Sequence, residues 1–192
     1  MTLLQFADRQ IAVPPTLIDW LTARMDRSLA AARALVADLD AAALARLLAL
    51  KQRPAAKGMI VIAARPAQVD RYLRWSALAP ERRDQVLASW PGPNTWLIPC
   101  TDAVPHGLRG DHDTLAVRIT AHPVAAALCE AFGGPIVSTS ANRAGAPPAR
   151  RIGDLADDLR DALDGWVEGD TGDRALPSVI RDARDGRIIR PG

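Results

Sequence analysis

A cluster of three cationic side chains, Lys51, Arg53 and Lys57, lies in one short segment of the chain. A lysine ammonium is a compact charge and an arginine guanidinium is a planar fork, so together they suit a polyphosphate that loses a leaving group. Cations at the C-terminal end of a helix are also stabilised by the helix dipole, so a purely structural role stays open. In either case we expect Lys51 and Arg53 to lie at an exposed helix end.

Small polar side chains follow a short apolar segment at Ser138, Thr139, Ser140 and Asn142. In open α/β sheets, ligands sit beyond the carboxyl ends of strands. Hydroxyl and backbone N–H groups at such a position can bind a phosphate or a ribose. A turn or a helix N-cap would need one or two such residues rather than four. The run therefore favours a nucleotide-binding role over a local turn.

Arg118 lies in a segment with apolar residues at every second position, at Leu115, Val117 and Ile119. If these three face the core of a sheet, Arg118 faces the opposite side, because successive side chains of a strand point to opposite faces. There a guanidinium can bind a carboxylate through two parallel hydrogen bonds. The alternative is an ordinary surface arginine on a half-exposed sheet.

Several familiar sites of chemistry are absent from the sequence. It has no GxxxxGK[ST] loop, no GxGxxG loop, no HExxH motif and no EF-hand loop. The histidines His106, His112 and His122 share no spacing typical of metal ligands, so we expect surface or capping roles and no resident metal. Cys100 and Cys129 form no CxxC pair, and we expect free thiols, as in a reducing cytosol.

The composition is that of an ordinary globular protein. The chain has 192 residues, 48% of them hydrophobic and 24% charged, which excludes a wholly disordered chain and fits one domain over residues 1–192. Apolar runs such as Met59–Ala64 are far too short to span a bilayer, and the first residues lack the features of a secretory signal. We therefore expect a cytoplasmic protein. The formal net charge of +2 does not by itself predict a nucleic-acid partner, although 22 of the 24 basic residues are arginine.

Strands and helices are expected to alternate along the chain. Helices are predicted by apolar spacing and by capping or breaking residues, and strands by short runs rich in valine and isoleucine. The expected helices cover residues 16–49, a segment that begins at Pro66, 80–89, 122–132 and 152–163, and the expected strands cover 59–64, 95–99, 114–120, 135–138 and a hairpin over 179–190 that turns at Asp185-Gly186. This order favours an α/β fold with a mixed sheet.

Four segments of the chain resemble the YrdC/Sua5 family, in its short bacterial form. They read KQRPAAKGMIVIAA, SWPGPNTWLIP, DTLAVRITAHPVAAALCEAFGGPIVSTSAN and PSVIRDARDGRIIRPG, and they follow in order with matching spacing from about Ala42 to Gly192. The Lys-x-Arg and Ser-Thr-Ser-Ala-Asn motifs are signatures of that family. The resemblance implies one YrdC-like α/β domain, in which a twisted open mixed sheet and its helices surround a large basic concave pocket.

The resemblance also implies an activity. Members of the family join L-threonine, bicarbonate or CO2, and ATP into threonylcarbamoyl-AMP and pyrophosphate, with Mg2+ assisting, which makes them nucleotidyltransferases. The product passes to a tRNA threonylcarbamoyl transferase complex that modifies certain tRNAs. The family is also linked with double-stranded RNA, so tRNA or double-stranded RNA is an expected partner and a membrane is not.

Individual residues carry over by motif. The resemblance implies catalytic contacts from Lys51 and Arg53 to the ATP phosphates, with Lys57 nearby. It implies that the nucleotide is also held by Thr95, Ser140, Asn142 and Arg190, and that threonine is held by Arg118, Thr139 and Ser178. The nucleophile in this reaction is the carbamate of threonine, so the protein must position the substrates and neutralise charge at the α-phosphate.

One family signature is missing from this chain. Counting back from Lys51, the family's Tyr-Pro-Thr-Glu segment falls on Arg27–Ala30, and the glycines of the following loop fall on Ala34 and Val36. Residues 1–40 are therefore atypical of the family. The enzyme is active with a rebuilt pocket wall, or it is a degenerate paralogue that binds nucleotide or RNA without making the product, or the first 40 residues are an altered or mispredicted stretch on an otherwise family-like body. The sequence leaves these three hypotheses open.

Overall fold

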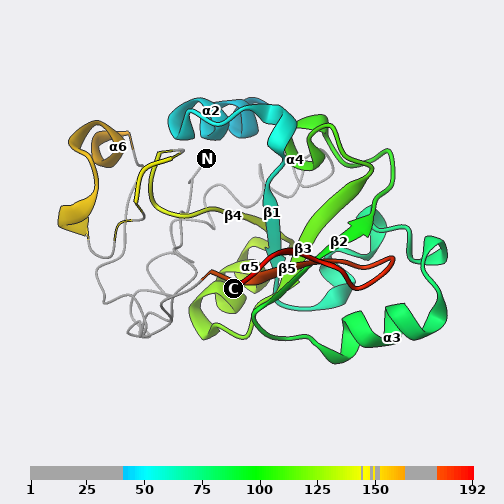
Figure 1. The fold of residues 1–192 in the computed structure, drawn as a ribbon. Coiled ribbons are helices and arrows are strands. Elements are labelled where there is room, and N and C mark those ends of the chain that lie inside the picture. Colours follow the sequence, from blue (N-terminus) through cyan, green and yellow to red (C-terminus); the bar gives the residue numbers. More distant parts are fainter. Residues whose placement is uncertain (1–40, 144, 148, 150–151, 163–176) are drawn as a thin grey trace.

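The fold is built on a six-stranded mixed sheet (Figure 1). The computed structural model describes residues 41–143, 145–147, 149, 152–162 and 177–192. The strands are β1 (Ile60–Ala63), β2 (Asn94–Pro99), β3 (Thr114–Ile119), β4 (Ile136–Ser138), β5 (Val179–Asp182) and β6 (Ile188–Arg190), in the spatial order β4-β1-β3-β2-β5-β6. β1 is parallel to β3 and β2 is parallel to β5, whereas the other neighbours are antiparallel. The prediction of an α/β fold with a mixed sheet is confirmed.

Helices and short 3-10 turns surround this sheet. In the described residues the helices are α2 (Ala41–Lys51), α3 (Pro80–Ala88), α4 (His106–Arg109), α5 (Pro123–Phe132) and α6 (Asp157–Asp161), and the 3-10 turns are η1 (Ala55–Lys57), η2 (Pro66–Gln68), η3 (Asp70–Tyr72), η4 (Trp75–Ala77) and η5 (Ile152–Asp154). Figure 1 shows α2 and α4 side by side at the top of the molecule, where they contact each other.

The main apolar core fills one face of the sheet. Leu47 of α2, Val86 of α3 and Leu108 of α4 belong to it. The strands contribute alternate residues, namely Val61, Ala63, Trp96, Ile98, Leu115, Val117 and Ile119. The alternation predicted for the third strand is therefore confirmed, because Leu115, Val117 and Ile119 all belong to this core.

α5 covers the β1–β4 part of the opposite face. Ile62 packs there with Ala125 and Cys129 of the helix. The sequence sets both ends of α5: the His122 ring accepts the N–H of Ala125 at the start, and Gly133 takes the left-handed conformation at the end, with φ of 76°. The helix predicted here is confirmed. The rest of this face, over β3, β2 and β5, carries polar residues such as Arg118 and Thr95 together with apolar ones such as Leu97 and Ile180.

The helix predicted to begin at Pro66 is wrong. The chain instead forms η2 and η3, and Leu73 then pairs with Cys100 as an isolated bridge. The Gln68 side chain accepts the backbone N–H of Ala64 at 2.8 Å, which draws the first turn back onto the end of β1. A side chain that bonds its local backbone competes with the helical ladder, so an α-helix does not propagate here.

The remaining predicted elements are present with small shifts of their ends. The predicted helix over 80–89 is α3, and the predicted hairpin is β5 and β6, with Gly186 in the left-handed conformation at its turn. The segment 152–162 forms η5 and α6 rather than one helix. The reason is local, because Ala156 leaves the helical region with ψ of 139°.

Part of the predicted organisation lies outside the described residues. Residues 1–40 contain the beginning of the first predicted helix. They also contain Arg27–Ala30, where the family has Tyr-Pro-Thr-Glu, and the loop positions Ala34 and Val36. The single domain expected over residues 1–192 stays a prediction for that stretch.

Some classes of chemistry find no support in the described part of the chain. Its two cysteines are free and buried, as predicted. No helix there has both the length and the apolar character that crossing a bilayer requires. Nor does that part of the chain gather three or more histidine, cysteine, aspartate or glutamate side chains suited to a metal ion.

Two glycines let the segment between α2 and β1 lie directly against α4. Gly58 and Gly110 both have a left-handed backbone, with φ of 60° and 65°. A Cβ atom on Gly110 would lie 2.2 Å from the carbonyl oxygen of Ala56, and one on Gly58 would lie 2.9 Å from that of Arg109. The N–H of Asp111 donates to the same Ala56 carbonyl at 3.1 Å. This backbone contact fixes the path of the chain that leads from α2 into the sheet.

Gly110→Ala should lower the free energy of unfolding by about 2–4 kcal/mol, because the new Cβ meets backbone atoms that cannot turn aside. Gly133→Ala is the matched control, since Gly133 also has a positive φ but nothing lies within 4 Å of its Cβ position. Gly133→Ala should lower the free energy of unfolding by only about 1 kcal/mol. Urea unfolding of both variants measures the difference, and equal losses would contradict the close packing at Gly110.

Candidate functional site

The Lys51 ammonium holds two distant parts of the chain together. Lys51 is the last residue of α2 and is only 3% exposed. Its Nζ donates hydrogen bonds to the backbone carbonyls of Ser140 and Asn142 and, at 3.1 Å, to the side-chain oxygen of Asn142. An ammonium has three donors, and three oxygens receive them here. We call Lys51 with residues 140–142 the Lys51 turn.

The sheet explains why these residues meet. β4 is antiparallel to β1, with Ser138 opposite Ile60. The chain that follows β4 therefore passes beyond the beginning of β1, at the end where α2 delivers Lys51. The helix stops there because Gln52 takes a left-handed backbone, with φ of 49°, shortly before Pro54.

Burial sets the charge properties of Lys51. Desolvation, with a smaller contribution from the positive charge of Arg53, lowers the pKa of Lys51 from 10.5 to about 8. The ammonium is therefore charged near neutral pH and loses its charge as the pH rises through its pKa. The prediction that both cations lie at an exposed helix end is wrong. Lys51 is buried and Arg53 is half-buried, because the turn after β4 packs over the end of α2.

The Arg53 guanidinium closes the loop between α2 and β1. Its Nε and Nη2 donate to the Gly58 carbonyl at 3.0 and 2.8 Å, and Nη2 also reaches the Lys57 carbonyl at 3.4 Å. Nη1 of Arg53 has no hydrogen bond within the described residues. Burial lowers the pKa of Arg53, but a guanidinium stays charged in proteins. Nη1 and the exposed Lys57 side chain are thus open to an anion.

The turn after β4 is anchored by its own side chains. The Ser140 hydroxyl donates to the side-chain oxygen of Asn142, while the Asn142 side-chain nitrogen donates to a carbonyl further along the loop. Arg143 donates to the Leu50 carbonyl at 3.2 Å and forms an ion pair with Asp158 of α6. The sequence patterns did not predict a role for Arg143. Its position directly after the Ser-Thr-Ser-Ala-Asn motif is the one feature of the sequence that indicates such a role.

A second set of candidate residues lies in one row across the sheet. The register places Arg118 of β3 level with Ile62 of β1 and opposite Thr95 of β2. Ile180 of β5 lies beside Thr95, and Arg190 of β6 pairs with Ile180. Residues that are level across neighbouring strands point to the same face. Arg118, Thr95 and Arg190 therefore share the face of the sheet on which α5 lies.

Ser178 joins this row next to Thr95. The two hydroxyl oxygens lie 3.0 Å apart and share a hydrogen bond, and both residues are fully buried. Arg190 donates to the Ser178 carbonyl at 2.8 Å. We call these residues together with Arg118 the Arg118 row. Thr95, which is expected to bind the nucleotide, thus contacts Ser178, which is expected to bind threonine.

Arg118 is a buried charge. It is only 6% exposed, so the alternative of an ordinary surface arginine is wrong. Burial lowers the pKa of His122, and the positive charge of Arg118 lowers it further. The His122 ring is therefore neutral near neutral pH and accepts the N–H of Ala125 as a helix cap. Its capping role, and the exposed positions of His106 and His112, agree with the sequence prediction.

The site offers cations and hydroxyls rather than a thiol nucleophile. Burial raises the pKa of Cys129 to about 12 and also raises that of Cys100, so neither thiol is ionised near neutral pH. The Lys51 turn lies at the beginning of β1, whereas the Arg118 row crosses the sheet at the level of Ile62. Thr139 is half-buried and follows β4 directly. Such an arrangement can bind and orient anionic substrates.

Comparison with known proteins points to one family. The family model for the Sua5, YciO and YrdC proteins, described as "Telomere recombination", matches residues 33–192. A threonylcarbamoyl-AMP synthase of Xanthomonas oryzae pv. oryzae is 54% identical over 149 residues, which are 78% of this chain and 80% of the relative. The protein of the same name from Stenotrophomonas maltophilia is 51% identical, with the same coverage.

Solved structures share the fold. P. abyssi Sua5 complexed with L-threonine aligns with a TM-score of 0.71 and 30% identity over 80% of this chain and 45% of that chain, so this chain spans less than half of it. E. coli YciO aligns with a TM-score of 0.63 and 23% identity over 80% of this chain and 74% of that chain, which shows the fold alone. With the family model matched over most of its length and relatives at 54% identity, this chain belongs to the Sua5/YrdC family.

Proposed function

We propose that this chain is a threonylcarbamoyl-AMP synthase, a nucleotidyltransferase that forms threonylcarbamoyl-AMP and pyrophosphate from L-threonine, bicarbonate or CO2, and ATP. The observation that carries the proposal is 54% identity to a threonylcarbamoyl-AMP synthase over 80% of that protein's length. The L-threonine complex of P. abyssi Sua5 supports threonine as a substrate. Among the residues that the family resemblance assigns, Lys51, Ser140 and Asn142 belong to the Lys51 turn, and Arg118, Thr95, Ser178 and Arg190 belong to the Arg118 row.

The Lys51 turn supports binding of the nucleotide. Lys51 brings a positive charge next to Ser140 and Asn142, and Arg53 and Lys57 follow it in the loop between α2 and β1. We assign the three cations to the ATP phosphates, and Ser140 and Asn142 to phosphate or ribose oxygens, since hydroxyl and amide groups bind both. Because three oxygens already receive the Lys51 donors, binding of ATP exchanges one of them for a phosphate oxygen.

The Arg118 row supports binding of threonine. A buried guanidinium binds a carboxylate through two parallel hydrogen bonds, so we assign Arg118 to the carboxylate of threonine. Thr139 and Ser178 are assigned to the threonine side, and Thr95 and Arg190 to the nucleotide side. The hydrogen bond of 3.0 Å between Thr95 and Ser178 supports two adjoining subsites, as the reaction requires.

The proposed reaction needs positioned charge more than covalent catalysis. The amino group of threonine forms an N–C bond with CO2 and loses a proton, which gives a carbamate. A carbamate oxygen then attacks the α-phosphorus of ATP, the bond from that phosphorus to the bridging oxygen breaks, and pyrophosphate leaves with the electron pair. The substrate supplies the nucleophile, in keeping with the un-ionised thiols. Lys51 and Arg53 stabilise the charge of the departing pyrophosphate.

We do not propose a dedicated protein site for Mg2+. This ion prefers carboxylate and phosphate oxygens. No group of three or more acidic, histidine or cysteine side chains suited to a metal lies in the described ranges. We therefore assign any Mg2+ to the phosphates of ATP rather than to the protein.

The proposal extends to where the product goes. Threonylcarbamoyl-AMP would pass to a tRNA threonylcarbamoyl transferase complex in the cytoplasm, with tRNA as the final acceptor. The alternative is a degenerate paralogue that binds nucleotide, double-stranded RNA or tRNA without catalysis. The observation in its favour is the departure from the family at Arg27–Ala30.

The purified chain should release pyrophosphate only when ATP, L-threonine and bicarbonate are all present together with Mg2+. A coupled pyrophosphate assay measures this release, and omission of each substrate in turn is the control. A folded protein that ATP stabilises against heat, but that releases no pyrophosphate, would favour the binding-only paralogue and overturn the synthase proposal.

Lys51→Met should weaken ATP binding by about tenfold or more, because it removes a charge-assisted hydrogen bond to phosphate. In the wild-type protein, ATP affinity should fall as the pH rises from about 7 to about 9, since the pKa of Lys51 is about 8 and the side chain is neutral above it. The variant should lose that pH dependence. Titration calorimetry at several pH values measures both effects.

Arg46→Met is the matched control for this variant. Arg46 is exposed on the same helix, and its loss also removes one positive charge. The control should keep the ATP affinity and its pH dependence, and a thermal melt shows whether both variants fold. If Lys51→Met bound ATP as the wild type does, Lys51 would hold the turn only, and its assignment to the phosphates would be wrong.

Arg118→Lys should raise the KM for L-threonine by about tenfold or more and leave the KM for ATP nearly unchanged, because lysine cannot reproduce a bidentate contact to a carboxylate. Arg181→Lys is the matched control: Arg181 is half-buried on β5 but level with Trp96, and so faces the other side of the sheet. Steady-state kinetics with each substrate varied measures both constants. An equal rise of the two KM values would contradict the assignment of Arg118 to threonine.

A further inference from the structure

A separate cavity of about 300 Å³ lies at the far end of β2 and β3. Pro99 lines it and pairs with Thr114 at that end of the two strands. Thr95 and Arg118 lie at the other end, and four residues of extended strand between Thr95 and Pro99 span about 13 Å. The cavity is therefore distinct from the Arg118 row.

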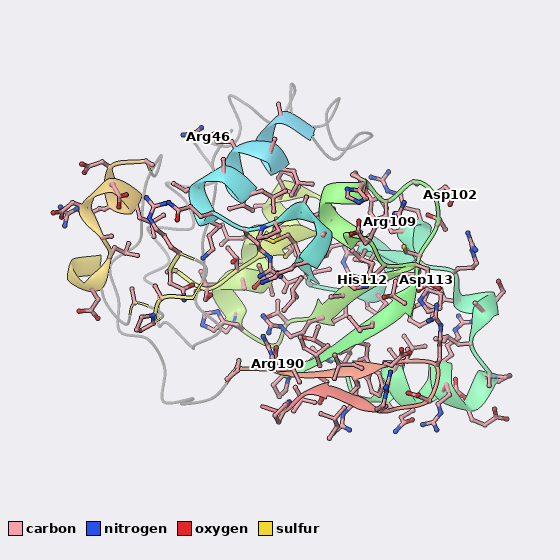
Figure 2. All side chains as sticks on the ribbon, turned by 45° about the horizontal axis from the view of Figure 1, so that its top comes forward. Arg46, Asp102, Arg109, His112, Asp113 and Arg190 are labelled. Atoms are coloured by element: carbon pink, nitrogen blue, oxygen red, sulfur yellow. The ribbon has the colours of Figure 1, made fainter. Side chains whose placement is uncertain are left out.

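Three arginines from separate parts of the chain line this cavity. Arg74 follows η3, Arg109 ends α4, and Arg184 lies in the turn between β5 and β6. Figure 2 shows Arg109 on the same side of the molecule as Asp102 and Asp113, away from the end of β6. Elements distant in the sequence thus bring three guanidinium groups to one small space.

The two acidic residues of the lining do not cancel these charges. Asp113 forms an ion pair with Arg184, so these two charges offset each other. Arg109 donates to a neutral acceptor, the backbone carbonyl of residue 112, at 2.9 Å. The guanidinium of Arg74 has no hydrogen bond or ion pair among the residues that the structure describes. Apart from the Asp113–Arg184 pair, the lining thus contains two arginines, Arg74 and Arg109, and one exposed carboxylate, that of Asp102, so its net charge is positive.

The Cys100 thiol lies within reach of these charges. It lines the cavity, is 7% exposed, and donates to the Asp113 carbonyl at 3.4 Å. Burial raises the pKa of the thiol, Arg109 lowers it, Asp113 raises it and Arg74 lowers it. Arg74 and Arg109 thus act electrostatically on the same interior point.

We propose that this cavity binds a phosphate group between Arg74 and Arg109, either as inorganic phosphate or as part of a small phosphorylated metabolite. The planar forks of two guanidinium groups suit the oxygens of a phosphate. The volume of about 300 Å³ lies at the lower limit of small-molecule sites, which favours a small ligand over a whole nucleotide. None of the residues assigned to ATP lines this cavity, so the proposed anion site is a different set of residues and goes beyond the proposed synthase activity.

Titration of the full chain with inorganic phosphate, against sodium chloride of equal ionic strength, tests the proposal. Arg74→Gln and Arg109→Gln should each weaken phosphate binding by about tenfold. Arg187→Gln is the matched control, because Arg187 lies on the same hairpin as Arg184 but does not line the cavity. Unchanged affinity in the two cavity variants, with folding verified by thermal melts, would overturn the proposal.

Phosphate could also enter the proposed ATP site, and Lys51→Met separates the two sites. If the cavity is the phosphate site, Lys51→Met should still bind phosphate there, although its affinity for ATP is reduced. If phosphate binding disappeared in Lys51→Met and persisted in Arg74→Gln, the cavity would not be a phosphate site, whatever the fate of the synthase proposal.

Alkylation of Cys100 gives a second readout at the cavity itself. Phosphate should slow the reaction of Cys100 in the wild type about in proportion to occupancy, and Arg74→Gln should need about tenfold more phosphate for the same protection. Glycerol phosphate distinguishes the two forms of the ligand. If it protects Cys100 more strongly than inorganic phosphate does, the ligand is a phosphorylated metabolite. If its protection is equal or weaker, the ligand is free phosphate. Absence of protection by both ligands would contradict the proposal.

Discussion

A buried lysine at the end of a helix fixes the geometry of the candidate site. Removing an ammonium from water is costly unless its donors meet oxygen atoms. For Lys51 these oxygens belong to Ser140 and Asn142, so the need to satisfy one charge ties α2 to a turn 89 residues further along the chain. Burial lowers the pKa of Lys51 to about 8, and the side chain still carries its charge near neutral pH. Arg53 and Arg143 close the loops on either side of this contact.

The sheet supplies the second constraint, because its register determines the face to which each of the other candidate side chains points. Its parallel and antiparallel pairs bring Arg118 of β3, Thr95 of β2 and Arg190 of β6 into one row, in which Ile180 of β5 lies between Thr95 and Arg190, although these residues lie far apart in the sequence. All three share one face, and α5 occupies only the β1–β4 part of that face. A buried arginine, a pair of hydroxyls and a second arginine then lie in one row. A reaction that joins an amino acid to a nucleotide needs this kind of shared surface, because the two substrates must touch.

Local signals in the sequence predicted local structure well. Alternation gave β3 and the direction of Arg118, and His122 with Gly133 marked the ends of α5. The same signals failed where a contact between residues far apart in the sequence determines burial or local structure. The burial of Lys51 depends on a turn beyond β4, so the sequence pattern predicted an exposed helix end there, and for Arg118 the pattern left open a binding residue or a surface arginine. The 3-10 turns after Pro66 replaced an expected helix because one glutamine side chain bonds the end of β1.

Detection of the product itself tests the central claim most directly, namely that the Lys51 turn and the Arg118 row form one synthase site. The chain is incubated with ATP, L-threonine and bicarbonate that carries a heavy carbon isotope, and the products are analysed by mass spectrometry. We expect a species with the mass of threonylcarbamoyl-AMP that contains one labelled carbon. AMP or ADP without any labelled adduct, from a folded chain that binds ATP, would contradict the claim.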